Sequence, residues 1–308
     1  MRDEHAERYH DGMNPAKIVR FRDSERYFIC PLCHDALHLD GTSLRCANRH
    51  TFDIAKQGYA NLSPSAKQSQ FYNKESFANR GHILDAGYYD HIMRAVLEAV
   101  DNHCPAPHNV DFAGLRDAQR PAVLDAGCGE GFYARAVQDA HPEADVLAFD
   151  ISKDSIRQAA HEDMGMAVKW FVGNLADLPV HDGTIDCILD VFSPIHYDEF
   201  RRVMKDDAVV IKVVPGAHHD EQLRELARAQ LRNADYSNEQ TIEQFATHFT
   251  IVDSQLISQT FAMPDDDMRT FAHMTPLLFN VNVDALDLTP INELTIEAHV
   301  LVGKKMDS

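Results

Sequence analysis

Three cysteines and one histidine stand at spacings that suit a metal ion. Two residues separate Cys30 from Cys33, and Cys46 and His50 follow as a second pair with three residues between them. Zinc prefers four thiolate or imidazole ligands at the corners of a tetrahedron, and two tight loops can each supply two of them. A complete set of four protein ligands leaves no open position for a substrate. The pattern therefore predicts one structural zinc ion per chain, and the alternative is a set of unrelated buried thiols.

A glycine-rich turn forms a second group of residues that could bind a nucleotide-like cofactor. Gly127, Gly129 and Gly131 follow an apolar strand pattern and precede a helical one, so a ligand could approach the backbone closely there. Both nicotinamide enzymes and methyltransferases use such turns. Asp125, just before the first glycine, would repel a pyrophosphate but could accept hydrogen bonds from an ammonium group. Asp150 ends the next strand, where a carboxylate can accept both hydroxyl groups of a ribose.

Two further runs, at 173–179 and 181–186, resemble the third and fourth motifs of class I S-adenosylmethionine (SAM) methyltransferases. Asn174 stands where that class often has an adenine-contacting aspartate, and its amide oxygen can also accept a hydrogen bond. Asp190 lies in the following strand, at the sheet edge where the methyl group would meet its target, and is a candidate catalytic residue. It could equally be a structural strand-end carboxylate. These motifs favour a SAM site over an unrelated Rossmann-like fold.

The elements that must position these residues alternate between strand and helix. Nearly continuous apolar runs predict buried strands at 122–127, 145–150, 168–173, 185–192 and 208–214. Helical spacing predicts helices at 131–141, 154–163, 220–233 and near 265–275, and later strands are expected at 250–258 and 296–304. This alternation predicts a doubly wound α/β domain with a mostly parallel sheet. Upstream, apolar residues at helical spacing between about 75 and 102 predict one or two helices.

Charge is distributed unevenly along the chain. The formal net charge is −19 over 308 residues, which at first argues against nucleic-acid binding. Residues 1–80, however, carry 12 Lys+Arg against 10 Asp+Glu, and the segment 45–80 carries six basic residues against two acidic ones. This N-terminal region could therefore bind a polyanion. No window reaches the roughly 18 apolar residues of a membrane span, and a cytoplasmic protein is expected.

The order of these parts resembles the bacterial 23S rRNA (guanine-N1)-methyltransferases of the RlmA type, which include macrolide-resistance members. The likeness extends from about Phe28 to the C-terminus. Its most specific marks are the Cys3His pattern, FDIAKQGYANL at 52–62, ILDAGYY at 83–89, LDAGCGEGFY at 124–133 and PGAHH at 215–219. The resemblance implies additional SAM contacts from Tyr89, Tyr133, Ala134 and His219, with His218 as the alternative to His219.

The resemblance also implies an activity. The chain is expected to be a class I SAM-dependent methyltransferase, Rossmann-like, with a small N-terminal zinc-binding β module. It would methylate N1 of a guanine in a 23S rRNA hairpin, guanine 748 being favoured over guanine 745, and so modulate macrolide sensitivity. Because N1 lies on the Watson–Crick edge, the enzyme must take an unpaired or extruded base. A homodimer is a further expectation.

Four segments are expected along the chain. These are a flexible extension at 1–26, a zinc-binding RNA-recognition module at 27–63, a linker with helices at 64–120 and the methyltransferase domain at 121–308. Two alternatives from other classes are a small-molecule SAM methyltransferase with a structural zinc lobe and a non-catalytic RNA-binding protein. The intact glycines, Asp125 and Asp150 oppose the non-catalytic alternative.

Overall fold

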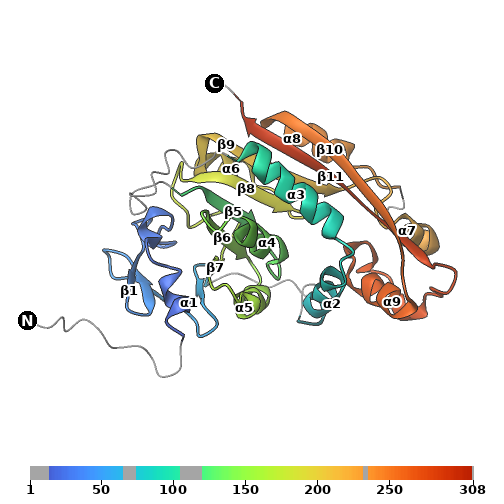
Figure 1. Ribbon diagram of the computed structural model, residues 1–308, viewed down its shortest axis with the longest axis horizontal. Coiled ribbons are helices and arrows are strands. Elements are labelled where there is room, and N and C mark those ends of the chain that lie inside the picture. The colour runs from blue at the N-terminus through green and yellow to red at the C-terminus, as the bar shows by residue number, and fades with distance from the viewer. Residues whose placement is uncertain (1–13, 65–73, 105–119, 232–234, 307–308) are drawn as a thin grey trace, which may run out of the picture.

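The computed structural model describes residues 14–64, 74–104, 120–231 and 235–306. Within these ranges, eight strands form one long sheet with helices on both faces (Figure 1). Their spatial order is β10 (Phe249–Ala262), β11 (Glu293–Lys305), β9 (Met204–Pro215), β8 (Ile185–Val191), β5 (Ala122–Ala126), β6 (Asp145–Asp150), β7 (Lys169–Val172) and β4 (Tyr59–Asn61).

The strands from β9 to β4 pair in parallel, whereas β11 pairs antiparallel with both β9 and β10. Every residue of β5, β7 and β8 is buried, as expected for parallel strands covered on both faces. The mostly parallel, doubly wound sheet predicted from the alternating pattern is therefore confirmed. Two short helices, α6 (Tyr197–Val203) and α8 (Glu239–Ala246), were not predicted.

Helices cover the sheet in two layers. α3 (Asp90–His103), α4 (Phe132–Ala140) and α5 (Lys153–Glu162) bury their apolar sides in one cluster, and α6 and α8 contribute to the other. Figure 1 shows α3 crossing the strands near β9 and β11, and α2 (Lys74–Asp85) packs beside α9 (Asp265–Met274). The short helix α7 (Glu221–Ala227) contacts β11. Within the described ranges, no helix combines the length and apolarity that crossing a bilayer requires.

The N-terminal module has a small sheet of its own. β1 (His38–Asp40), β2 (Ser43–Arg45) and β3 (Thr51–Asp53) pair antiparallel in sequence order. The chain then enters the large sheet, because β4 pairs in parallel with β7 at the sheet edge. The module therefore shares a hydrogen-bonded sheet with the α/β domain.

Residues 14–26 are not a flexible extension. They form α1 (Ala16–Val19) and a 3-10 turn, η1 (Ser24–Arg26), and they bury Ile18 and Phe21. The expectation failed because these apolar residues are isolated in a polar stretch and pack against distant parts of the chain. Residues 1–13 lie outside the described residues.

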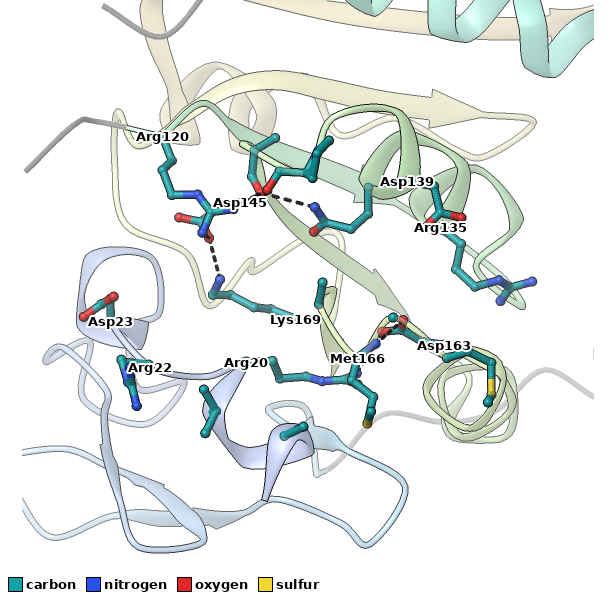
Figure 2. Close-up of a pocket in the computed structure, with 18 of the residues that line it drawn as sticks. Arg20, Arg22, Asp23, Arg120, Arg135, Asp139, Asp145, Asp163, Met166 and Lys169 are labelled. Carbon is teal, nitrogen blue, oxygen red and sulfur yellow. Dashed lines mark hydrogen bonds and ion pairs between the residues drawn. The ribbon is translucent and has the colours of Figure 1, made fainter. Parts of the chain in front are cut away.

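Buried polar contacts connect this N-terminal segment to the large sheet, near the amino ends of its parallel strands. Arg20 forms an ion pair with Asp163 at 3.1 Å, and Lys169 forms one with Asp145 at 2.9 Å (Figure 2). The hydroxyl of Tyr27 donates a hydrogen bond to Asp145 at 2.8 Å. A buried ion pair adds little net stability, but removing one partner leaves an uncompensated charge. The Arg20 ion pair and the Tyr27 hydrogen bond therefore favour one orientation of the module on the domain, and Lys169 pairs with Asp145 within the large sheet.

Candidate functional site

The four predicted metal ligands lie together in the N-terminal module. Their ligand atoms lie within 4.8 Å of one another. The Cys33 and Cys46 sulfurs are 3.6 Å apart, and Nδ1 of His50 lies 3.4 Å from the Cys30 sulfur and 3.5 Å from the Cys46 sulfur. Thiolates bound tetrahedrally to zinc at about 2.3 Å would stand about 3.8 Å apart. The cluster therefore fits a tetrahedral zinc ion, and zinc is a structural cofactor of this chain.

Local turns present the ligands in pairs. His34 and Arg49 adopt left-handed backbone conformations, one directly after Cys33 and the other directly before His50. Hydrogen bonds from Asn48 and from the backbone lower the pKa of the Cys33 thiol to about 6, which favours the thiolate that a metal ion needs. His34, although adjacent to a ligand, is outside the cluster.

A cavity of about 860 Å³ opens at the carboxyl ends of the parallel strands. Eight of the ten predicted cofactor residues line it: Tyr89, Asp125, Gly127, Gly129, Tyr133, Asp150, Asn174 and His219. Gly131 and Ala134 do not line it. Asp125 accepts a hydrogen bond from the backbone N–H of Ala134, so Ala134 acts on the cavity wall through its main chain.

The three glycines of the turn have different surroundings. A Cβ built at Gly131 would contact the ring of Trp170, and a Cβ built at Gly127 would lie 2.9 Å from the Cβ of Ser193. At these two positions the protein's own packing excludes a Cβ, and of the two only Gly127 lines the cavity. A Cβ at Gly129 would instead lie 3.1 Å from the Arg80 guanidinium, at the cavity wall.

Two carboxylates of the cavity fit the polar groups of SAM. Asp125 is buried, its Oδ2 has no hydrogen-bond partner, and burial raises its pKa to about 8. A buried acceptor of this kind is suited to an ammonium group. Asp150 accepts hydrogen bonds from the backbone N–H groups of Gly129 at 3.1 Å and Ser152 at 2.8 Å. Each carboxylate oxygen of Asp150 has further acceptor capacity for a ribose hydroxyl. The donor and acceptor set therefore fits SAM.

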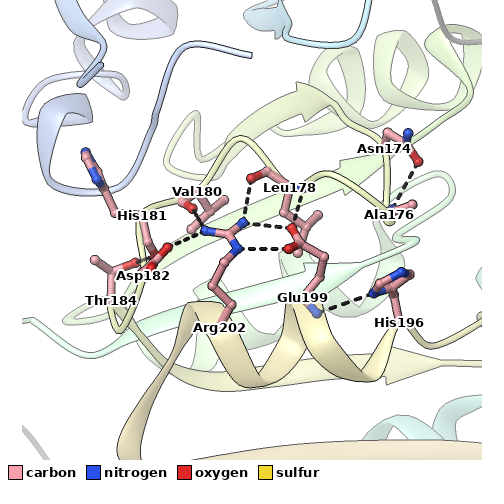
Figure 3. Close-up of polar contacts among 10 residues, drawn as sticks. All are labelled: Asn174, Ala176, Leu178, Val180, His181, Asp182, Thr184, His196, Glu199 and Arg202. Atoms are coloured by element: carbon pink, nitrogen blue, oxygen red, sulfur yellow. Dashed lines mark hydrogen bonds and ion pairs between the residues drawn. The ribbon is translucent and has the colours of Figure 1, made fainter. Parts of the chain in front are cut away.

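Asn174 lies at the start of the loop that follows β7. Arg202 of α6 holds this loop by donating to the carbonyl oxygens of Leu178 at 2.9 Å and Val180 at 2.8 Å (Figure 3). Glu199 pairs with Arg202 and accepts from the Leu178 N–H at 2.7 Å. The unpredicted helix α6 thus anchors one wall of the cavity.

Asp190 is fully buried and does not line the cavity. Its Oδ2 accepts a hydrogen bond from Lys212 of β9 at 2.8 Å, and Lys212 also donates to the carbonyl oxygen of Ser193. Burial raises the pKa of Asp190 to about 7, although Lys212 opposes that shift. Lys212 does line the cavity, so its hydrogen bond links Asp190 to the cavity wall.

Aromatic rings form another part of the cavity wall. Phe192 adopts a left-handed backbone at φ 53° and is 37% exposed, which is unusual for a large apolar residue. Its ring centroid lies 6.0 Å from that of Tyr89 and 5.8 Å from that of His219. His219 lines the cavity, whereas His218 is exposed and pairs with Glu221. The geometry therefore favours His219 over His218 as the cavity residue.

Sequence reasoning did not identify Arg80 and Phe77, which reach the cavity from α2. The helical spacing of Phe77, Leu84 and Tyr88 predicts a helix in this segment, and α2 confirms it. That spacing does not indicate that Phe77 and Arg80 face the cavity.

Comparisons with known proteins agree on both parts of the chain. The family model for the RlmA N-terminal zinc ribbon matches residues 28–70, and a methyltransferase-domain model matches residues 123–213. YxjB of Bacillus subtilis, named as a candidate 23S rRNA (guanine-N(1)-)-methyltransferase, is 30% identical over 90% of this chain and 97% of its own length. The 23S rRNA (guanine(748)-N(1))-methyltransferase of Streptomyces fradiae is 29% identical over 91% of this chain and 98% of its own.

Proposed function

This chain belongs to the family of SAM-dependent 23S rRNA (guanine-N1)-methyltransferases, and we propose that it methylates N1 of a guanine in a 23S rRNA hairpin. The observation that carries this proposal is the cavity at the strand ends, which is lined by the glycine turn, by Asp125 with its unpaired Oδ2 atom and by the ribose acceptor Asp150. The relatives match along almost their whole length, so both the zinc ribbon and the methyltransferase domain are shared.

The residues of this chain bind and orient SAM, which when bound supplies an electrophilic methyl group on its sulfonium. Asp125 accepts from the ammonium group, Asp150 from the ribose hydroxyls, and Asn174 contacts the adenine. Tyr89, Tyr133 and His219 enclose the ligand and exclude water. These residues would place the cofactor next to the target base, and positioning of this kind would supply much of the rate. Because N1 is hidden in a duplex, the guanine must enter the cavity unpaired.

Asp190 positions Lys212 in this proposal and does not itself contact the base. The Asp190 carboxylate is fully buried and accepts a hydrogen bond from Lys212, a residue that lines the cavity. A neutral side chain at 190 would leave a buried cation without its partner. We therefore expect Asp190→Asn to lower both SAM affinity and stability, instead of removing only the chemical step.

The N-terminal module would hold the RNA. Arg45, Arg49 and Lys56 are exposed on or beside its strands and belong to the basic segment of an otherwise acidic chain. Cations that neutralise phosphates make RNA affinity fall with salt. The substrate would be guanine 748, for which the Streptomyces fradiae relative is named. The expected biological effect is altered macrolide sensitivity, and the expected location is the cytoplasm.

Transfer of a labelled methyl group to a 23S rRNA hairpin transcript, followed by mass mapping of the modified nucleotide, tests the activity and the position together. Methylation of N1 of guanine 748 supports the proposal. Methylation of a guanine elsewhere in the hairpin would overturn the position alone. Transfer to small metabolites without transfer to RNA would identify a small-molecule enzyme, and no transfer to either would favour a non-catalytic RNA-binding protein.

Filter binding across a salt series tests the RNA contacts. The triple variant of Arg45, Arg49 and Lys56 to alanine should weaken binding and flatten the salt dependence by up to about one unit per lost contact. The matched control replaces three exposed arginines of the α/β domain, Arg94, Arg201 and Arg269, by alanine and removes the same charge. Equal slopes for the two triple variants would mean that the module does not hold the RNA.

A further inference from the structure

The charges of the cavity leave one group of SAM without an assigned partner. The amino-acid end of SAM carries an ammonium group and an α-carboxylate. Asp125, Asp150 and Asp220 line the cavity, and they suit cations or hydroxyl groups. A carboxylate brought among these acids needs a cation close to the glycine turn. Three candidates line the cavity, namely Arg80, Lys212 and Arg224.

Two of these cations donate to backbone carbonyl oxygens of the protein. Lys212 is buried and donates to Asp190 and to the carbonyl oxygen of Ser193. Arg224 donates to the carbonyl oxygens of Ala217 and His219, and its guanidinium lies 5.2 Å from the ring centre of Tyr236. Both therefore serve to hold the protein backbone, and Lys212 also holds a neighbouring acid.

Arg80 lies over the glycine turn. Its Nη1 would be 3.1 Å from a Cβ built on Gly129 and is 3.5 Å from the Glu130 carboxylate. The guanidinium also lies 5.7 Å from the ring centre of Phe77, one turn earlier on α2. About a quarter of the Arg80 side chain is exposed, whereas Glu130 is almost wholly buried. Glu130 and Phe77 thus hold the guanidinium at the cavity wall, beside the backbone that the amino-acid end of SAM would approach.

We propose that Arg80 binds the α-carboxylate of SAM and so makes the site selective for ligands that carry that carboxylate. This inference rests on the proposed function. A guanidinium presents a planar fork of donors that matches a carboxylate with two parallel hydrogen bonds. Glu130, whose carboxylate lies 3.5 Å from the guanidinium, would orient Arg80 at the cavity wall. Arg80 and Asp125 would then bind the two opposite charges of the same amino-acid group.

Calorimetry with SAM and with decarboxylated SAM tests this assignment, because the two ligands differ only in the carboxylate. The wild type should bind SAM more tightly than the decarboxylated compound. Arg80→Met should weaken SAM binding by about tenfold to a hundredfold, as expected for a charge-assisted pair. Binding of decarboxylated SAM should change by less than about threefold. Arg80→Lys should recover part of the loss, because it restores the charge without the fork.

Arg94→Met is the matched control, since Arg94 is exposed on the neighbouring helix α3 and its substitution removes one equal charge. It should leave both affinities unchanged. Circular dichroism of each variant confirms that it is folded before titration. Equal weakening of both ligands by Arg80→Met would show that Arg80 only supports Glu130, and unchanged SAM binding would place the carboxylate elsewhere. Either result overturns the inference. A wild type that binds neither ligand would instead overturn the proposed function.

Discussion

Gly131 shows why the turn before α4 needs a glycine at its last position. Its backbone has a φ of 79°, and a Cβ there would lie 2.7 Å from Cζ3 of Trp170 and 3.0 Å from Cβ of Ala159. Both neighbours are fully buried and cannot move cheaply. An alanine would cost about 1–2 kcal/mol for the left-handed backbone and about 1–3 kcal/mol for overpacking. Gly131→Ala should therefore lower the free energy of unfolding by about 2–5 kcal/mol.

Gly183 provides the matched comparison. Its φ is 62°, and nothing lies within 4 Å of a Cβ built there, so Gly183→Ala isolates the backbone cost. That variant should lose only about 1–2 kcal/mol. Urea unfolding of the zinc-containing protein, followed through Trp170 fluorescence and circular dichroism, measures both losses; Trp170 is the one tryptophan of the sequence. Equal losses in the two variants would refute the claim that contact with Trp170 excludes a side chain at Gly131.

Three other predictions concern the bound groups. Cys33→Ser should release zinc and loosen the N-terminal module while SAM affinity changes little. Metal analysis measures the zinc content and calorimetry the SAM affinity, and a wild type that is fully ordered without zinc would contradict the prediction. Asp150→Ala should weaken SAM and methylthioadenosine alike by about 1.5–3 kcal/mol, because both ligands carry the ribose, and calorimetry should find no such loss if the ribose binds elsewhere. Burial raises the pKa of Asp125 to about 8, so accepting from an ammonium group must release a proton near neutral pH. SAM affinity should therefore rise from about pH 6 to about pH 8, and Asp125→Asn should flatten that rise.

The apolar pattern within single segments correctly predicted the strands whose burial follows from their own composition. The apolar runs that became β5, β6, β7 and β8 are buried on both faces, so their composition alone identified them as strands. The two missed helices are short and carry few apolar residues. Residues 14–26 were misjudged because their burial comes from contacts far along the chain, such as the ion pair between Arg20 and Asp163.

The same distinction applies to the site. Asp125 and Asp150 could be predicted because they stand at strand ends beside a recognisable turn. Arg80 could not, because it reaches the cavity only through the packing of α2 against α9 and α5, which no local pattern encodes. The sequence also could not show that Gly131 is needed to make room for the ring of Trp170, because Trp170 follows Gly131 by almost forty residues.

The pairing of β4 with β7 has a consequence for how the chain matures on the ribosome. β4 ends at Asn61, and the strand that completes its ladder begins at Lys169, roughly 110 residues later. At translation rates of about 5–20 residues per second, this interval lasts about 5–20 s. The four metal ligands are all synthesised before it, so zinc can bind while β4 still presents an unpaired edge to solvent. Zinc binding and the pairing of β4 with β7 are thus separate events. A chain whose synthesis stops between them would hold zinc while the backbone N–H and C=O groups of β4 remain unpaired and able to bond to other chains.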